Sequence, residues 1–77
     1  MEIIPLPELQ IGERARVVSL NAAGPQRRRM LDLGLVPQAV IEALRKSPAG
    51  DPVAYRIRGA VIALRREEAS LVMVTRI

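Results

Sequence analysis

Short apolar runs separated by turn residues dominate the chain, and this pattern favours strands over helices. The clearest run is VAYRIR, in which Val53, Tyr55 and Ile57 would face one side and the residues between them the other. Runs of this kind predict strands at residues 14–20, 39–46, 53–58, 60–64 and 71–76, after a short lead-in at residues 6–9. The chain is therefore predicted to be mainly β.

One segment departs from this pattern and predicts a helix over residues 25–33. Pro25 suits the first helical position, because its missing N–H would be unpaired there in any case and its fixed φ is already helical. Gly34 stands where a left-handed residue ends a helix at low cost, and Leu35 can then fold back onto Met30. The run LDLGL is thus explained as a helix ending without any ligand.

Turn residues divide the second half of the chain. The loop SPAGDP, residues 47–52, contains two prolines, a glycine and an aspartate, and Arg58-Gly59 predicts a tight hairpin turn. The segment RREEAS, residues 65–70, is long enough for one helical turn before the last strand. We predict a small barrel of about five strands with one inserted helix, because closing the sheet leaves few unpaired edges.

Length and composition predict one domain over residues 1–77 with an aliphatic core. The apolar fraction is 49%, yet it holds a single aromatic residue, Tyr55, which we expect inside the barrel with its hydroxyl at the rim. The start MEIIPLP lacks the basic and apolar regions of a signal peptide, and no segment approaches the roughly 18 apolar residues of a membrane span. A cytoplasmic protein is the expectation.

The charge balance is basic, with a net charge of +4 and eleven arginines among twelve cationic residues. Such a surface favours anionic partners, and nucleic acid is one class of them. Helical geometry splits the run Arg27 to Arg29, however, because Arg28 and Arg29 would face solvent while the stem of Arg27 packs along the apolar edge. Tyr55 is also the only residue on which a base could stack. A solvated basic surface is the favoured interpretation.

No catalytic, cofactor or metal site is predicted. The chain has no histidine and no cysteine, which removes the commonest general base, the commonest metal ligand and the nucleophile arrangements that depend on them. Glu67 and Glu68 are neighbours that diverge on a helical turn, and Glu42 is isolated. We interpret these carboxylates as a solvated face that balances nearby arginines.

Four segments together resemble a known family. They are PLPELQIGERARV, RRRMLDLGLVP, SPAGDPVAYRIRG and AVIALRREEASLVMV, and they cover nearly the whole chain in the family's order. In these segments the chain resembles FeoA, the small cytoplasmic accessory protein of bacterial ferrous iron uptake. The resemblance implies an SH3-like barrel, a general link to transition metals, and a partner, the Fe(II) transporter FeoB, which has a cytoplasmic GTP-binding domain. Similar domains also occur at the carboxyl end of iron- or manganese-dependent repressors.

The chain departs from the family pattern at one turn. Where the family usually has glycine after Val-Pro, this chain has Gln38. Gln38 must either keep a negative φ, so that the local turn differs, or accept modest strain.

The resulting hypothesis is a non-enzymatic module that docks on the cytoplasmic side of FeoB and modulates its assembly or activity. Exposed arginine beside apolar residues is a common interface composition. The predicted contact residues are Arg28, Arg29, Leu35, Val36, Arg56 and Arg58. The alternatives are a basic nucleic-acid-binding barrel and a metal-linked regulatory domain, and a homo-oligomer is compatible with each of them.

Overall fold

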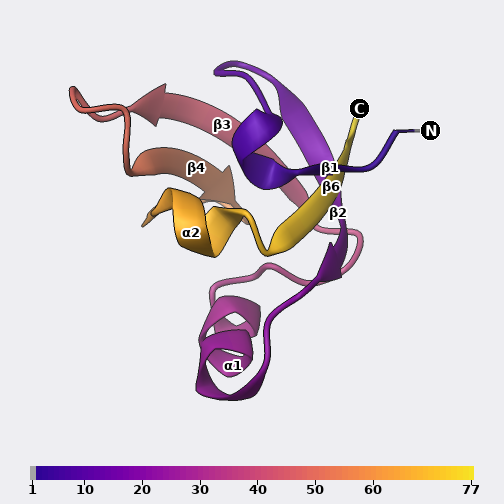
Figure 1. Cartoon of the computed structure of the whole chain (residues 1–77). Coiled ribbons are helices and arrows are strands. Elements are labelled where there is room, and N and C mark those ends of the chain that lie inside the picture. The colour runs from indigo at the N-terminus through magenta and orange to yellow at the C-terminus, as the bar shows by residue number, and fades with distance from the viewer. Residues whose placement is uncertain (1) are drawn as a thin grey trace.

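The structure is a computed structural model that describes residues 2–77, and within them it has six strands, two α-helices and one 3₁₀ helix (Figure 1). All strand pairs are antiparallel, in the order β1-β6-β2-β3-β4-β5. The elements are β1 (Ile4–Pro5), η1 (Leu6–Glu8), β2 (Arg14–Leu20), α1 (Gly24–Asp32), β3 (Val40–Lys46), β4 (Val53–Ile57), β5 (Ala60–Leu64), α2 (Arg66–Ala69) and β6 (Val72–Arg76).

The five predicted strands, the inserted helix and the helical turn before the last strand are all confirmed, with ends that differ by at most one residue. The predicted lead-in is the 3₁₀ helix η1. The two-residue strand β1 was not predicted, and it adds a short edge beside β6.

Two irregularities bend the sheet around its own core. The pairing of β2 with β6 shifts between Val17 and Ser19, and the pairing of β3 with β4 shifts between Ala43 and Arg45. An extra residue at such a bulge bends the strand and increases its twist. In β2 it also resets the inward face, and for this reason Leu20 is buried three positions after Val17.

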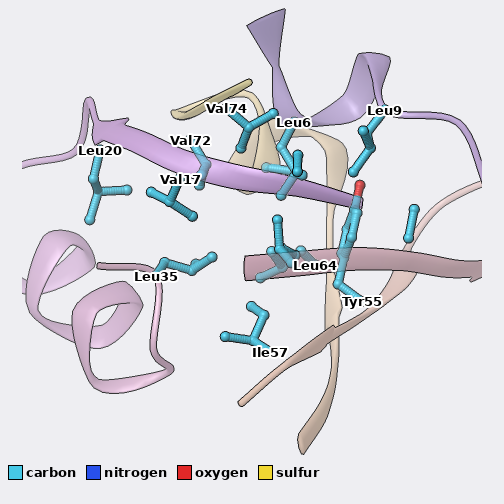
Figure 2. Close-up of a cluster of buried hydrophobic side chains, with 14 of the residues drawn as sticks. Leu6, Leu9, Val17, Leu20, Leu35, Tyr55, Ile57, Leu64, Val72 and Val74 are labelled. Carbon is cyan, nitrogen blue, oxygen red and sulfur yellow. The ribbon is translucent and has the colours of Figure 1, made fainter. Parts of the chain in front are cut away.

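The core consists of aliphatic side chains packed around one aromatic ring, that of Tyr55. Figure 2 shows side chains from η1, β2, β4, β5 and β6 converging on the space inside the curved sheet. Tyr55 is 1% exposed, which confirms its predicted place in the barrel core. Burying one Leu- or Phe-sized side chain contributes about 1.5–3 kcal/mol relative to leaving it exposed, so this cluster supplies most of the driving force for folding.

The ending of α1 ties the helix to the sheet. The Leu35 N–H donates to the Met30 carbonyl at 3.1 Å, and the Gly34 N–H donates to the Leu31 carbonyl at 2.9 Å. These two bonds define the Schellman motif, and the φ of 102° at Gly34 completes it. Leu35 and Met30 are both fully buried, so the predicted contact between them belongs to the core.

Among residues 2–77, two residues other than glycine have positive φ, and both lie in tight turns. Arg58 (φ 52°) precedes Gly59 (φ 80°) in the turn between β4 and β5, which confirms the predicted hairpin. Gln38 (φ 77°) lies in a turn that the Ala39 N–H closes on the Val36 carbonyl at 3.1 Å. Gln38 therefore accepts a conformation that glycine adopts more cheaply, as one of the two expectations for this position required.

The two ends of the described chain meet, as Figure 1 shows. The Arg76 guanidinium on β6 donates to the carboxylates of Glu2 at 3.1 Å and Glu13 at 3.2 Å. The pKa of Glu13 is lowered, chiefly by the backbone N–H of Gln10 and then by Arg76. One arginine thus connects the last strand to the first residues and to the loop before β2.

We expect Gly34→Ala to destabilise the fold by about 1–3 kcal/mol, because positive φ strains a residue that has a Cβ. The added carbon would also lie 3.1 Å from the Ile57 Cγ2. Gly50→Ala is the matched control, since Gly50 has a φ of 90° but nothing within 4 Å of the added carbon. Urea unfolding measures both losses, and equal losses would show that the close approach of α1 to β4 contributes nothing.

Candidate functional site

The predicted contact residues lie on α1, on the turn that follows it and on the β4–β5 hairpin. Four of them are exposed, one is half-buried and one is buried. In that order they are Arg28, Arg29, Arg56 and Arg58, then Val36, then Leu35. Five of the six predicted contact residues are therefore at least partly exposed.

The prediction that Leu35 is a contact residue is wrong. Its side chain is 0% exposed and belongs to the hydrophobic core, so it cannot contact a partner in this conformation. The physical reason is the helix ending itself, because the Schellman turn at Gly34 directs the next residue back onto Met30. Val36, the next residue along, keeps a half-buried apolar side chain at the surface.

The three consecutive arginines of α1 have three different surroundings. The Arg27 guanidinium donates to the Leu20 carbonyl at 2.9 Å, which ties the helix to the end of β2. Arg29 forms an ion pair with Glu68 of α2. Within residues 2–77, Arg28 has no ion-pair partner and is exposed to solvent. The run is thus divided by helical geometry, as predicted, and Arg28 is its free cation.

The pair of Arg29 and Glu68 has an electrostatic consequence. The pKa of the Glu68 carboxyl is lowered, first by the Arg29 guanidinium and then by the backbone N–H of Arg65, which donates to the same carboxylate. Because Glu68 belongs to α2, the pair fixes the outer face of α1 against the segment before β6. Arg29 is therefore partly committed to holding the fold together.

Arg58 and Arg56 lie close in sequence but differ in surroundings. A Cβ built on Gly34 would lie 3.4 Å from the Arg58 Cδ, so the stem of Arg58 crosses the end of α1 while the residue stays exposed. Arg56 instead pairs with Glu42 of β3 at 3.4 Å on the outer face of the sheet. The structure thus places Arg58, and not Arg56, at the end of α1.

A cavity of about 240 Å³ lies elsewhere, between η1, the β3–β4 loop and α2. Its lining includes Leu9, Asp51, Tyr55 and Arg66, and Figure 2 shows the Tyr55 oxygen directed toward the side where Leu9 lies. Burial raises the pKa of the Tyr55 hydroxyl, and the nearby Arg66 partly opposes this. Sequence reasoning missed the cavity because segments far apart in the chain form its walls.

The model of the FeoA domain family matches residues 4–76. The chain belongs to the FeoA domain family. The resemblance to FeoA in the four sequence segments is confirmed. The match includes α1, its ending and the β4–β5 hairpin.

Relatives of this FeoA domain are known from sequence and from structure. The Fe(2+) transport protein A/Fe(2+) transporter FeoB fusion protein of Porphyromonas gingivalis is 38% identical over 69 residues, or 90% of this chain. The chain spans about 8% of that protein's length. The FeoA structure from Chlorobium tepidum is 40% identical with a TM-score of 0.89, and the match covers 96% of this chain and 70% of that one.

A third relative is the FeoA of Stenotrophomonas maltophilia, described as a prokaryotic SH3 domain protein and complexed with zinc. It is 30% identical with a TM-score of 0.81, and the match covers 91% of this chain and 87% of that one. The predicted SH3-like fold is confirmed.

Zinc ligands of the usual kind do not fit this chain. Zinc is bound in proteins mainly by imidazole and thiolate, and the sequence has neither histidine nor cysteine. Within residues 2–77, carboxylates do not gather into a group of three or more that could hold a metal ion. Across the same residues, no helix is long and apolar enough to cross a membrane.

We expect Arg29→Gln to raise the pKa of Glu68 toward its ordinary value of 4.5, because the guanidinium is the largest cause of the lowering. A lowered carboxyl pKa stabilises the fold while the group is charged. The variant should therefore be less stable at neutral pH, by at most about 1 kcal/mol for an exposed pair. The difference should disappear as the pH falls from 4.5 through the lowered pKa.

Carbon-13 NMR titration of the Glu68 carboxyl, with urea unfolding at neutral and acid pH, measures both effects. Arg28→Gln is the matched control, since it removes the neighbouring charge from α1 without removing an ion pair found within residues 2–77. An unchanged Glu68 pKa in Arg29→Gln would contradict the assigned cause.

Proposed function

We propose that this chain is a non-enzymatic accessory protein of bacterial ferrous iron uptake that docks on the cytoplasmic part of the FeoB Fe(II) transporter. The observation that carries the proposal is the Porphyromonas gingivalis relative, whose name joins Fe(2+) transport protein A and FeoB in one protein. A covalent tether raises the effective concentration of a contact between two modules. The fusion therefore supports a physical association between this kind of domain and the transporter.

The surface around the end of α1 supports a protein contact. Arg58 is exposed there, Val36 adds a half-buried apolar side chain, and Arg28 is exposed on α1 itself. Arginine heads beside apolar surface are enriched in the centres of protein interfaces, because the guanidinium can pair with carboxylates while its stem packs. We infer that this surface meets an acidic region of the partner.

The chemistry of the chain supports binding more than catalysis. Without histidine or cysteine, the Ser-His and Cys-His arrangements are unavailable. Several carboxylates are already engaged with arginine, as in the pairs formed by Glu13, Glu42 and Glu68. Glu42 and Glu68 pair with arginines as the sequence predicts, and the pairing of Glu13 was not predicted.

We expect saturable binding of the labelled chain to the purified cytoplasmic GTPase domain of the same organism's FeoB, with an affinity that differs between nucleotide states. The double variant Arg28→Glu, Arg58→Glu should weaken binding roughly tenfold or more, equivalent to about 1.4 kcal/mol, since it reverses two free charges. Fluorescence anisotropy at fixed salt measures both affinities.

Arg14→Glu, compared with each single variant, Arg28→Glu and Arg58→Glu, is the control for that titration. It reverses one exposed charge at the opposite end of β2 from the strand end that leads into α1. Equal weakening by this control would exclude the end of α1 as the contact. No binding in any nucleotide state would count against docking on the GTPase domain, and steeply salt-dependent binding to DNA or RNA would support the nucleic-acid alternative.

A further inference from the structure

The strand β5 forms one edge of the sheet. It stands last in the strand order and pairs with β4 alone among the strands of residues 2–77. Val61, the second residue of β5, is 50% exposed, and Ala60 and Ala63 are also exposed. The outer side of this strand therefore has no strand partner within residues 2–77.

The register with β4 determines which backbone groups are free. The two-residue turn at Arg58-Gly59 makes Ile57 and Ala60 a hydrogen-bonded pair, and such pairs recur at every second residue of an antiparallel ladder. The residues of β5 that bond to β4 are therefore Ala60, Ile62 and Leu64.

The two residues between them have backbone groups that point away from the sheet. Val61 and Ala63 direct both N–H and C=O outward, which leaves two donors and two acceptors along the edge. Outside the ladders, no backbone–backbone hydrogen bond within residues 2–77 uses either residue. An extended chain laid beside β5 could pair with all four groups.

This edge lacks the usual protection against pairing. Proteins commonly block edge strands with charges, prolines or bulges. The sequence of β5, AVIAL, has no charge and no proline, and its five pairs with β4 run without a shift. The edge is therefore a suitable template for a further strand.

Positively charged residues lie at both ends of β5. Arg58 lies in the turn before β5, and Arg65 and Arg66 follow its last residue. All three are exposed. A strand that pairs with β5 would therefore have arginine near both of its ends.

These flanking charges argue against a second copy of the chain as the occupant. In the antiparallel self-pairing that uses all four free groups, Val61 of one copy lies opposite Ala63 of the other. The same register brings the turn that contains Arg58 in one copy to the end of β5 in the other, where Arg65 and Arg66 follow, and like charges that meet there are destabilising. A segment with carboxylates on both sides of an aliphatic centre would gain attraction at those positions.

We propose that the outer edge of β5 is a docking site for an extended segment of a partner protein, aliphatic at its centre and acidic at both ends. The segment adds as a strand beside β5, so that its backbone supplies affinity and its charges supply specificity. This deepens the proposed function, and rests on it only for the identity of the protein that carries the segment. Arg58 would then contact the partner both at this edge and at the end of α1.

The first test uses a synthetic peptide, Glu-Glu-Val-Ile-Val-Glu-Glu with blocked ends, and the isotope-labelled chain. Binding should slow amide hydrogen exchange at Val61 and Ala63 roughly tenfold or more, because those N–H groups gain partners. The amides of Ala60, Ile62 and Leu64 already bond to β4 and should change much less. The peptide Lys-Lys-Val-Ile-Val-Lys-Lys is the charge control and should not bind.

The second test removes one outward donor. Ala63→Pro deletes an N–H that does not pair with β4, a position at which edge strands tolerate proline, whereas Ala63→Val keeps the donor. We expect the proline variant to bind the acidic peptide at least roughly tenfold more weakly and the valine variant to bind like the wild type. The urea midpoints of both variants show whether the fold is kept.

The outcomes separate this inference from the proposed function. If the acidic peptide does not bind, or binds without slowing exchange at Val61 and Ala63, the edge site is overturned whatever the GTPase domain does. If those amides are already protected in a concentration-dependent dimer of the free chain, self-pairing replaces the proposal. If the peptide protects them but the GTPase domain does not bind, the edge site stands and docking on that part of FeoB falls.

Discussion

The packing of the α1 ending against the β4–β5 hairpin determines where the charges of this molecule lie. Gly34 permits the approach because it has no Cβ, and the Schellman turn then buries Leu35. The stem of Arg58 lies over the same glycine. Since the helix is held at this point, the arginines on its outer face have fixed directions, and one of them can form an ion pair with α2. The basic surface is thus a consequence of a backbone turn.

The sequence predicted this part of the fold well because its signals are local. Pro25, Gly34 and the Arg58-Gly59 turn each restrict the backbone within a few residues, and no distant contact is needed to interpret them. Strand alternation likewise placed Tyr55 and Ile57 on the buried side of β4. Local backbone chemistry was sufficient for the helix ending, the hairpin and the strand ends.

Features that depend on distant partners could not be predicted in the same way. Alternation alone does not indicate a bulge, so the burial of Leu20 three positions after Val17 has no local signal. The ion-pair partners of Arg29 and Arg76 belong to elements distant in sequence. Leu35 shows a conflict between two predictions, because the helix ending that the sequence predicts folds Leu35 back onto Met30, whereas the choice of contact residues placed it at the surface. The sequence therefore predicted the kinds of residue at the candidate site better than it predicted which individual residues are exposed there.

The meeting of the two chain ends has a mechanical consequence. Because β1 pairs with β6 and Arg76 holds Glu2, a longer polypeptide that contained this fold would enter and leave it at nearly one point. Such a fold would branch from the host chain at one point and would add little to the distance between the segments on either side of it. Tension along the host would pull on the junction of β1 and β6, and the helix α1 would bear little of that load.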